Sequence, residues 1–197
     1  MKKNKEIILP PTYSIVLYGD NRVGTTSLIR RYIYGDYNPN FYNNGVDNYY
    51  KNIILDDGKE VKIHFVDIYN YRGFYYKIFL KKANGIMLTY DKTNRRSFEN
   101  IESRINEIEK DLNPNTPISL IGCKEDLYID EEVTTEEGEN LANEFGLFFY
   151  ETSAKENVNV NECFNDFINR INQMNQNDIN NVFSLIRERL PKRGCLK

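Results

Sequence analysis

The sequence has no tryptophan, a single histidine and only three cysteines among its 197 residues. Cys123, Cys163 and Cys195 are far apart and match neither the spacing of a zinc site nor a disulfide framework. This excludes a zinc-stapled or disulfide-stapled small domain, and we expect a reducing, intracellular compartment. His64 lies within an apolar run of strand character, with no second ligand near it. We therefore interpret it as an ordinary strand residue.

Long apolar runs and basic clusters are also missing. Residues 1–6 are charged and lead into three apolar residues before Pro10 and Pro11, which predicts neither a signal peptide nor a transmembrane segment. A formal net charge of -3 gives no electrostatic reason to expect a nucleic-acid partner. With 40% hydrophobic and 28% charged residues, the composition is that of a soluble globular protein. The length suits one well-cored domain.

What is present begins with residues 19–27, which read Gly-Asp-Asn-Arg-Val-Gly-Thr-Thr-Ser. This stretch follows a β-rich run over 13–18 and opens a helical segment near Thr25, as a phosphate-binding loop requires. Gly19 and Gly24 are spaced so that backbone N–H groups can face a polyphosphate. However, Thr25 occupies the lysine position of the pattern G-x-x-x-x-G-K-[S/T]. Taken alone, the stretch leaves phosphate binding and a plain strand-to-helix turn equally open.

Strand and helix patterns alternate along the rest of the chain. Strands are predicted over 13–18, 49–55, 61–66, 85–90, 118–121 and 147–150, and the turn at 56–58 joins the second and third as a hairpin. Helices are predicted over 25–35, after Ser97, from a capping box at 134–137, around 164–171 and over 179–190. The stretch 36–48 is predicted to be a loop. The pattern indicates an α/β fold with a doubly wound, mostly parallel six-stranded sheet, one antiparallel edge strand and about five helices.

Three polar groups fall near the ends of predicted strands: Asp67, residues 123–126 and residues 151–155. Each has an ordinary explanation, since Asp67 suits a helix cap and Lys124 with Asp126 suit solvated charges. In a doubly wound sheet, ligands bind at the carboxyl ends of the strands. Together with the glycine loop at the same edge, the three groups indicate a binding site.

The sequence resembles the small GTPases of the Ras superfamily, and most of all their Rab branch, over residues 13–171. Rab-like motifs stand at Gly45-Val46-Asp47, at 85–91, at 97–100 and at 151–155. The resemblance implies a P-loop G domain over 12–175, between an N-terminal extension at 1–11 and a variable tail at 176–197. It further implies Mg²⁺ with GTP or GDP, slow GTP hydrolysis, and effector proteins that bind two switch loops. A monomer that regulates vesicle trafficking, in the cytoplasm or on the cytoplasmic face of endomembranes, is expected.

The resemblance also assigns site residues. The phosphate loop would contribute Gly19, Asn21, Arg22, Val23, Gly24, Thr25, Thr26 and Ser27. Thr26 would ligate Mg²⁺, and Asp67 would hold the ion through water. The base would meet Tyr37, Lys124, Asp126, Ser153, Ala154 and Lys155, with Asp126 accepting hydrogen bonds that guanine can donate and adenine cannot.

Several positions depart from the family pattern. Cys123 replaces an asparagine that ties neighbouring loops together, and Thr25 replaces the lysine that contacts the β- and γ-phosphates. Asn43 falls on the Mg²⁺-binding threonine, Asn70 on a glycine whose N–H meets the γ-phosphate, and Tyr71 on the glutamine that orients the attacking water. We therefore assign no catalytic residue.

Three hypotheses follow from these departures. In the first, the chain binds guanine nucleotide weakly or in one state and hydrolyses GTP poorly or not at all. In the second, it is a nucleotide-free pseudo-GTPase that serves as a protein-interaction module. In the third, it is an active GTPase in which Arg22 supplies the missing charge. For the tail, Cys195 is followed by Leu196 and Lys197, which is neither a prenylation box nor a cysteine pair, so a lipid site and a free thiol both remain open.

Overall fold

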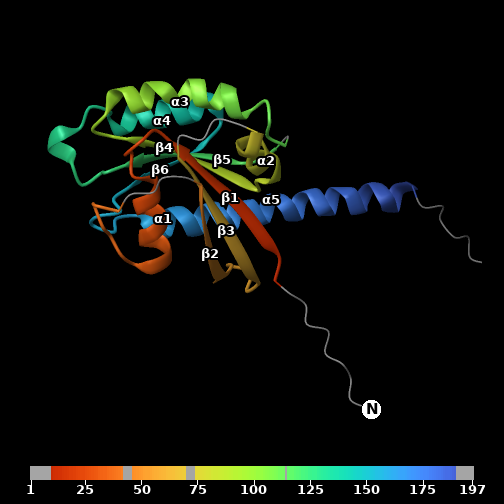
Figure 1. Cartoon of the computed structure of the whole chain (residues 1–197). Coiled ribbons are helices and arrows are strands. Elements are labelled where there is room, and N and C mark those ends of the chain that lie inside the picture. Colours follow the sequence, from red (N-terminus) through yellow and green to blue (C-terminus); the bar gives the residue numbers. More distant parts are fainter. Residues whose placement is uncertain (1–9, 42–45, 70–73, 114, 190–197) are drawn as a thin grey trace, which may run out of the picture.

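The computed structural model describes residues 10–41, 46–69, 74–113 and 115–189 (Figure 1). Strands and helices alternate through these residues. In chain order they are β1 (Thr12–Gly19), α1 (Thr25–Tyr34), β2 (Val46–Ile54), β3 (Glu60–Tyr69), α2 (Phe74–Lys82), β4 (Gly85–Asp91), α3 (Arg95–Ile108), β5 (Ile118–Cys123), a short 3₁₀ turn (Tyr128–Asp130), α4 (Thr135–Phe145), β6 (Phe148–Thr152) and α5 (Val160–Arg189).

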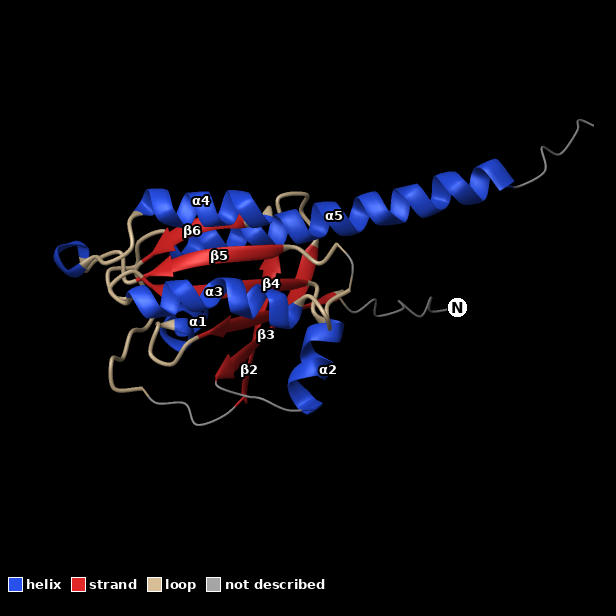
Figure 2. Cartoon of the chain, turned by 90° about the horizontal axis from the view of Figure 1, so that it is seen from above, coloured by secondary structure: helices blue, strands red, loops and turns tan. Residues whose placement is uncertain are grey.

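The strands form one six-stranded sheet in the order β2-β3-β1-β4-β5-β6. β2 pairs antiparallel with β3, and every other neighbouring pair is parallel. In β1, Ile15, Val16 and Leu17 are fully buried, because helices cover both faces of the sheet. α1 and α5 lie on one face, and α2, α3 and α4 lie on the other (Figures 1 and 2). The predicted doubly wound sheet with one antiparallel edge strand is confirmed.

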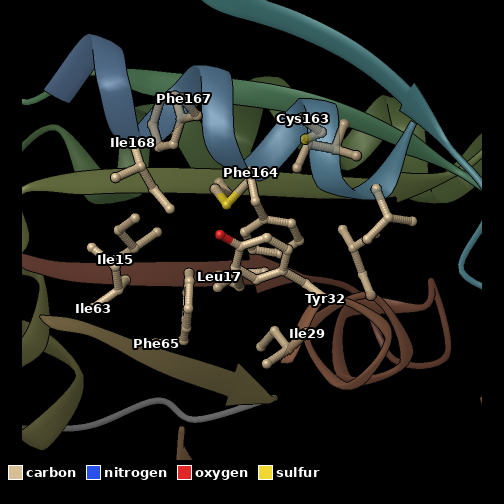
Figure 3. Packing of buried hydrophobic residues seen from close by; sticks show 14 of the residues in the cluster. Ile15, Leu17, Ile29, Tyr32, Ile63, Phe65, Cys163, Phe164, Phe167 and Ile168 are labelled. Atoms are coloured by element: carbon tan, nitrogen blue, oxygen red, sulfur yellow. The ribbon is translucent and has the colours of Figure 1, made fainter. Parts of the chain in front are cut away.

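An aromatic cluster fixes α1 against the sheet and α5 (Figure 3). The rings of Tyr32 and Phe164 stack with centroids 4.3 Å apart. Phe65 of β3 meets both rings edge-on. Such aromatic pairs stabilise packing beyond the area that they bury. The cluster therefore fixes the C-terminal part of α1 against β3 and α5.

Local signals in the sequence predicted several elements correctly. Thr134 and Glu137 form the capping box at the start of α4. The β2–β3 hairpin turns at residues 56–58, and His64 is a β3 residue whose ring stacks on Tyr50 and hydrogen-bonds Asn48. α3 begins at Arg95, before the predicted start, because the Asn94 side chain accepts a hydrogen bond from the backbone of Ser97.

Four expectations were wrong. α2 was not predicted, and the predicted loop 36–48 overlaps β2, which begins at Val46. Asp67 does not end its strand or cap a helix, because β3 continues to Tyr69. The separate helix predicted over 179–190 is part of α5, which runs unbroken to Arg189 and extends beyond the sheet (Figure 2). α5 crosses residue 175, where the G domain is predicted to end and the tail to begin. That boundary stays a prediction.

Within the described residues, no helix is both long enough and apolar enough to cross a membrane. The predicted N-terminal extension lies largely outside the described residues, as do Asn43, Asn70, Tyr71 and Cys195.

Candidate functional site: a nucleotide cavity

The loop between β1 and α1 needs glycine at both of its predicted positions. A Cβ atom at Gly19 would lie 2.1 Å from the Thr89 hydroxyl, so no side chain fits there. Gly24 has φ +113°, which disfavours other residues, and its carbonyl accepts the first hydrogen bond of α1 from Leu28 N at 2.9 Å. The chain thus curls closely over the end of β4 and enters α1 directly.

This loop borders a cavity of about 430 Å³ at the carboxyl ends of the strands. Most of the predicted phosphate-loop residues line it; the full lining is Gly19, Asp20, Asn21, Arg22, Gly24, Thr25, Thr26, Ser27, Tyr37, Pro39, Phe41, Asp67, Ile68 and Lys124. Val23 is the exception, since it is buried in the interior.

A second cavity of about 200 Å³ adjoins the first. The two share Gly24, Ser27, Tyr37 and Lys124. The remaining lining residues of the second are Leu28, Cys123, Asp126, Leu127, Thr152, Ala154 and Lys155. The predicted phosphate residues and the predicted base residues therefore border one bipartite cleft. Ser153 is buried just behind it.

At the first cavity, Thr26 and Asp67, which the resemblance assigns to Mg²⁺, lie in contact. The Thr26 hydroxyl donates to Asp67 Oδ2 at 2.5 Å, and Asp67 is 1% exposed. Mg²⁺ in nucleotide sites is held by one or two protein oxygens, by phosphate oxygens and by waters, so this pair fits the ion. The described residues contain no cluster of three or more His, Cys, Asp or Glu side chains that could hold a metal by themselves. The pair therefore suits an ion that arrives with a polyphosphate.

Thr25 makes a contact that the sequence did not suggest. Its hydroxyl lies 2.8 Å from the hydroxyl of Thr89, a fully buried residue of β4. The side chain at the lysine position thus hydrogen-bonds to the sheet and brings no charge to the cavity.

At the second cavity, Asp126 is held by the neighbouring loop. Its Oδ1 accepts a hydrogen bond from Ser153 Oγ at 2.7 Å, and its Oδ2 lies 3.6 Å from Lys155 Nζ. Ser153 Oγ in turn accepts from the backbone of Glu156 at 2.9 Å. Lys124, in a left-handed conformation, donates to Asp91 Oδ2 at 2.5 Å. The predicted base residues are therefore brought together, and hydrogen bonds and ion pairs connect Asp126 to Ser153 and Lys155.

Arg31, in the last turn of α1, was missed by sequence reasoning. Its Nε donates to the carbonyl of Ala154 at 2.6 Å and its Nη2 donates to that of Lys155 at 3.1 Å. These bonds tie α1, which starts at the phosphate loop, to the loop that carries Ala154. Nothing in the sequence distinguished Arg31 from other helix cations.

Cys123 packs beneath the phosphate loop. A Cβ built on Gly24 would lie 3.6 Å from Cys123 Cβ. Burial, together with the nearby charge of Asp91, raises the pKa of the thiol to about 12, although Thr152 and Lys124 act in the opposite direction. Apart from this sulfur, the buried Thr152 hydroxyl has no hydrogen-bond partner among the described residues. Cys123 is thus a neutral, weakly hydrogen-bonding neighbour of Thr152. A side chain with stronger hydrogen-bonding groups at this position would have the Thr152 hydroxyl as a partner.

Comparison with known proteins gives a consistent result. The family model described as "Ras family" matches residues 14–173. Ras-related protein Rab-8A of Gallus gallus is 36% identical over 155 residues, which cover 77% of this chain and 74% of that protein. Ras-related protein Rab-8B of Homo sapiens is 35% identical over 177 residues, covering 86% and 84%. Ras-related protein RABA6b of Arabidopsis thaliana is 36% identical over 168 residues, covering 82% and 72%. With this similarity over nearly all of its sheet and helices, the chain belongs to the Ras family and is a Rab-like small GTPase.

Proposed function

We propose that this chain binds GTP and GDP weakly through the bipartite cleft, hydrolyses GTP poorly or not at all, and regulates vesicle trafficking through effector proteins. The observation that carries the proposal is an asymmetry within the cleft. Its guanine end is pre-assembled, with Asp126 hydrogen-bonded to Ser153. At its phosphate end the lysine position is held by Thr25, which is hydrogen-bonded to β4.

Guanine preference rests on Asp126. An ionised carboxylate accepts about four hydrogen bonds, so one bond from Ser153 leaves capacity for N1–H and the exocyclic amine of guanine. Adenine offers no such donor pair. Because Ser153 and Lys155 already fix the carboxylate, little side-chain entropy is lost on binding.

Phosphate binding is weakened but not abolished by Thr25. A hydrogen bond to a charged group stabilises by about 1.5 to 3 kcal/mol, which corresponds to roughly ten- to a hundredfold in affinity. The curled loop retains its backbone N–H groups and the N-terminus of α1 for the phosphates. The loss of the family's asparagine at Cys123 adds to this weakening, and for both losses together we propose a dissociation constant in about the micromolar range.

Mg²⁺ would be held by Thr26 and Asp67, where it would neutralise phosphate charge. The Thr26–Asp67 hydrogen bond keeps the hydroxyl and the buried carboxylate together at the cavity wall. Poor hydrolysis is proposed from the sequence, because Tyr71 and Asn70 stand where the family has a water-orienting glutamine and a glycine. Both positions lie outside the described residues.

Thermal unfolding in the presence of nucleotides tests this function. A ligand that binds only the native chain stabilises it in proportion to RT ln(1 + [L]/Kd), so the midpoint should rise steadily with added Mg-GDP or Mg-GTP. At the same concentration, ADP and ATP should raise the midpoint much less than GDP and GTP do. A nucleotide-free interaction module, the second candidate, predicts no rise with any nucleotide at millimolar concentration.

The proposed function also includes attachment to endomembranes through the tail, at Cys195, and a monomeric state.

A further inference from the structure

Lys92 is a buried lysine directly after β4. Its side chain is 8% exposed, and its ammonium group lies 2.9 Å from Glu131 Oε1 and 2.8 Å from Glu151 Oε1. Lysine is almost never buried unless it is paired. Burial lowers the pKa of Lys92, but hydrogen bonds to Glu151 and Glu131 outweigh it and raise the pKa above its ordinary value. The group is therefore a cation that bridges two carboxylates.

The two carboxylates lead to the two loops that border the base end of the cleft, the Asp126 loop (residues 124–134) and the Ser153 loop (residues 153–159). Glu131 lies in the β5–α4 connection, which also carries Lys124 and Asp126. Glu151 lies in β6, two residues before Ser153. Both ion pairs share the Lys92 nitrogen. The ammonium group therefore joins the Asp126 loop to the end of β6, which leads into the Ser153 loop.

The backbone of Lys92 contacts the Asp126 loop at both of its ends. Its N–H donates to the carbonyl of Cys123 at 3.1 Å, where the loop begins. Its carbonyl accepts from the N–H groups of Glu132 at 2.9 Å and Val133 at 3.1 Å, where the loop ends. On the other side, Glu151 Oε2 accepts from the Thr135 hydroxyl at 2.9 Å, which extends the network to α4.

Removal of this cation would leave two carboxylates, 15% and 29% exposed, facing each other. Like charges at this separation repel, and an unpaired buried charge is strongly unfavourable. The loops would then move apart, and the Ser153–Asp126 hydrogen bond between them would weaken.

We propose that Lys92 is a positioning residue for guanine recognition. Through Glu131 and Glu151, it fixes the position of the Asp126 loop relative to the Ser153 loop. The inference rests on the proposed function, since it assigns a guanine contact to Asp126. Lys92 lines neither cavity and touches no substrate in this role.

The first measurement needs no nucleotide. Amide hydrogen exchange is compared among the wild type, Lys92→Met and Lys77→Met. Lys77→Met is the matched control, because it removes an ion pair to Asp111 that involves neither loop. Lys92→Met should raise exchange in 124–130 and 153–156 with the rest of the sheet unchanged, whereas Lys77→Met should not. Equal exchange in the two loops of both variants would overturn the inference.

The second measurement compares GDP with inosine diphosphate, which lacks the exocyclic amine that Asp126 would bind. Lys92→Met should reduce the preference for GDP by about tenfold, as for the loss of one well-placed hydrogen bond to a charged group. Adding Glu131→Lys to Lys92→Met returns a cation to Glu151 and should restore most of the preference. An equal loss of both nucleotides would overturn the positioning role.

Two further outcomes must be considered: a Lys92→Met variant that does not fold, and a wild type that binds no nucleotide. Should Lys92→Met fail to fold, Glu131→Gln, which removes one partly exposed partner, should show the same changes to a smaller extent. A lack of effect in that variant would contradict the inference. If the wild type binds neither diphosphate, the proposed function fails, and hydrogen exchange still decides whether Lys92 holds the two loops.

Discussion

The hydroxyl of Thr25 lies 2.8 Å from the hydroxyl of Thr89, so that a residue of the phosphate loop is hydrogen-bonded to the neighbouring strand β4. Thr89 is fully buried, and its Oγ1 also fills the space in which a Gly19 side chain would lie. The threonine at the lysine position is therefore part of a packed pair. This changes what a restored lysine can achieve.

We predict that Thr25→Lys combined with Thr89→Val tightens GDP binding at least tenfold, because a charge-assisted phosphate contact returns. Thr25→Lys alone should gain less, since it leaves the buried Thr89 hydroxyl without its partner, which is unfavourable by about 1 to 3 kcal/mol. Dissociation rates of fluorescent GDP measure both effects. Thr89→Val alone is the control and should bind no more tightly than the wild type. No gain in the double variant would show that the loop is closed to phosphate or that Arg22 already fills the role.

Cys123→Asn should tighten guanine nucleotide binding and stabilise the fold. Among the described residues, the buried Thr152 hydroxyl has no hydrogen-bond partner other than the Cys123 thiol, and an amide is a much stronger partner. We expect a gain of about threefold to tenfold, as for one neutral hydrogen bond of about 0.5 to 1.5 kcal/mol. Cys123→Ser serves as the control for size. A weaker affinity in Cys123→Asn than in Cys123→Ser would mean that the pocket beneath Gly24 is too tight for the amide.

Acid should destabilise the start of α4 through Glu137. Its ion pair with Arg95, at 2.7 Å, and then its hydrogen bond from the Thr134 backbone lower its pKa from 4.5 to about 2. A depressed pKa in the folded state stabilises the protein above pH 4.5, and this contribution is lost as the pH falls toward 2. Urea unfolding of the wild type and Glu137→Gln across this window measures it. The stability of the variant should fall less steeply, and parallel curves would contradict the assignment.

Hydrolysis of GTP should be at or below the slow intrinsic rate of ordinary small GTPases. The reaction needs a water in line with the γ-phosphate and donors aimed at the developing charge. By the family resemblance, Thr25, Asn70 and Tyr71 stand at the positions of three of these groups. Single-turnover assays at saturating protein measure the rate, and the double variant with Thr25→Lys and Thr89→Val should bind more tightly without faster turnover. Rapid turnover that Asp67→Ala abolishes would show that another residue has taken over.

The sequence predicted the sheet well because its strands are apolar runs bounded by turn residues, as in 85–90 and 118–121. The capping box at Thr134 and Glu137 is equally local, and it formed as predicted. α2 was missed because aromatic and aliphatic residues fill most of Phe74–Lys82, so the sequence shows little contrast between a buried and an exposed face.

Contacts between distant residues could not be read from the sequence. Thr25 and Thr89 are 64 positions apart, and Arg31 and Ala154 are 123 apart. Lys92 resembles any charged residue at a strand end, and only the fold shows that it is buried between Glu131 and Glu151. By contrast, the family resemblance, which supplies long-range information that periodicity lacks, assigned Thr26 and Asp67 to one Mg²⁺ site, and their side chains are hydrogen-bonded in the structure.

The most direct test of the account is an equilibrium titration of the purified chain with fluorescent GDP and ADP in the presence of Mg²⁺. We predict a dissociation constant for GDP in about the micromolar range, at least tenfold tighter than for ADP. Asp126→Ala should abolish that preference, because Asp126, fixed by Ser153, is the guanine-specific acceptor. Equal affinity for GDP and ADP, or no binding of either at millimolar concentration, would contradict the proposal that this cleft is a guanine nucleotide site.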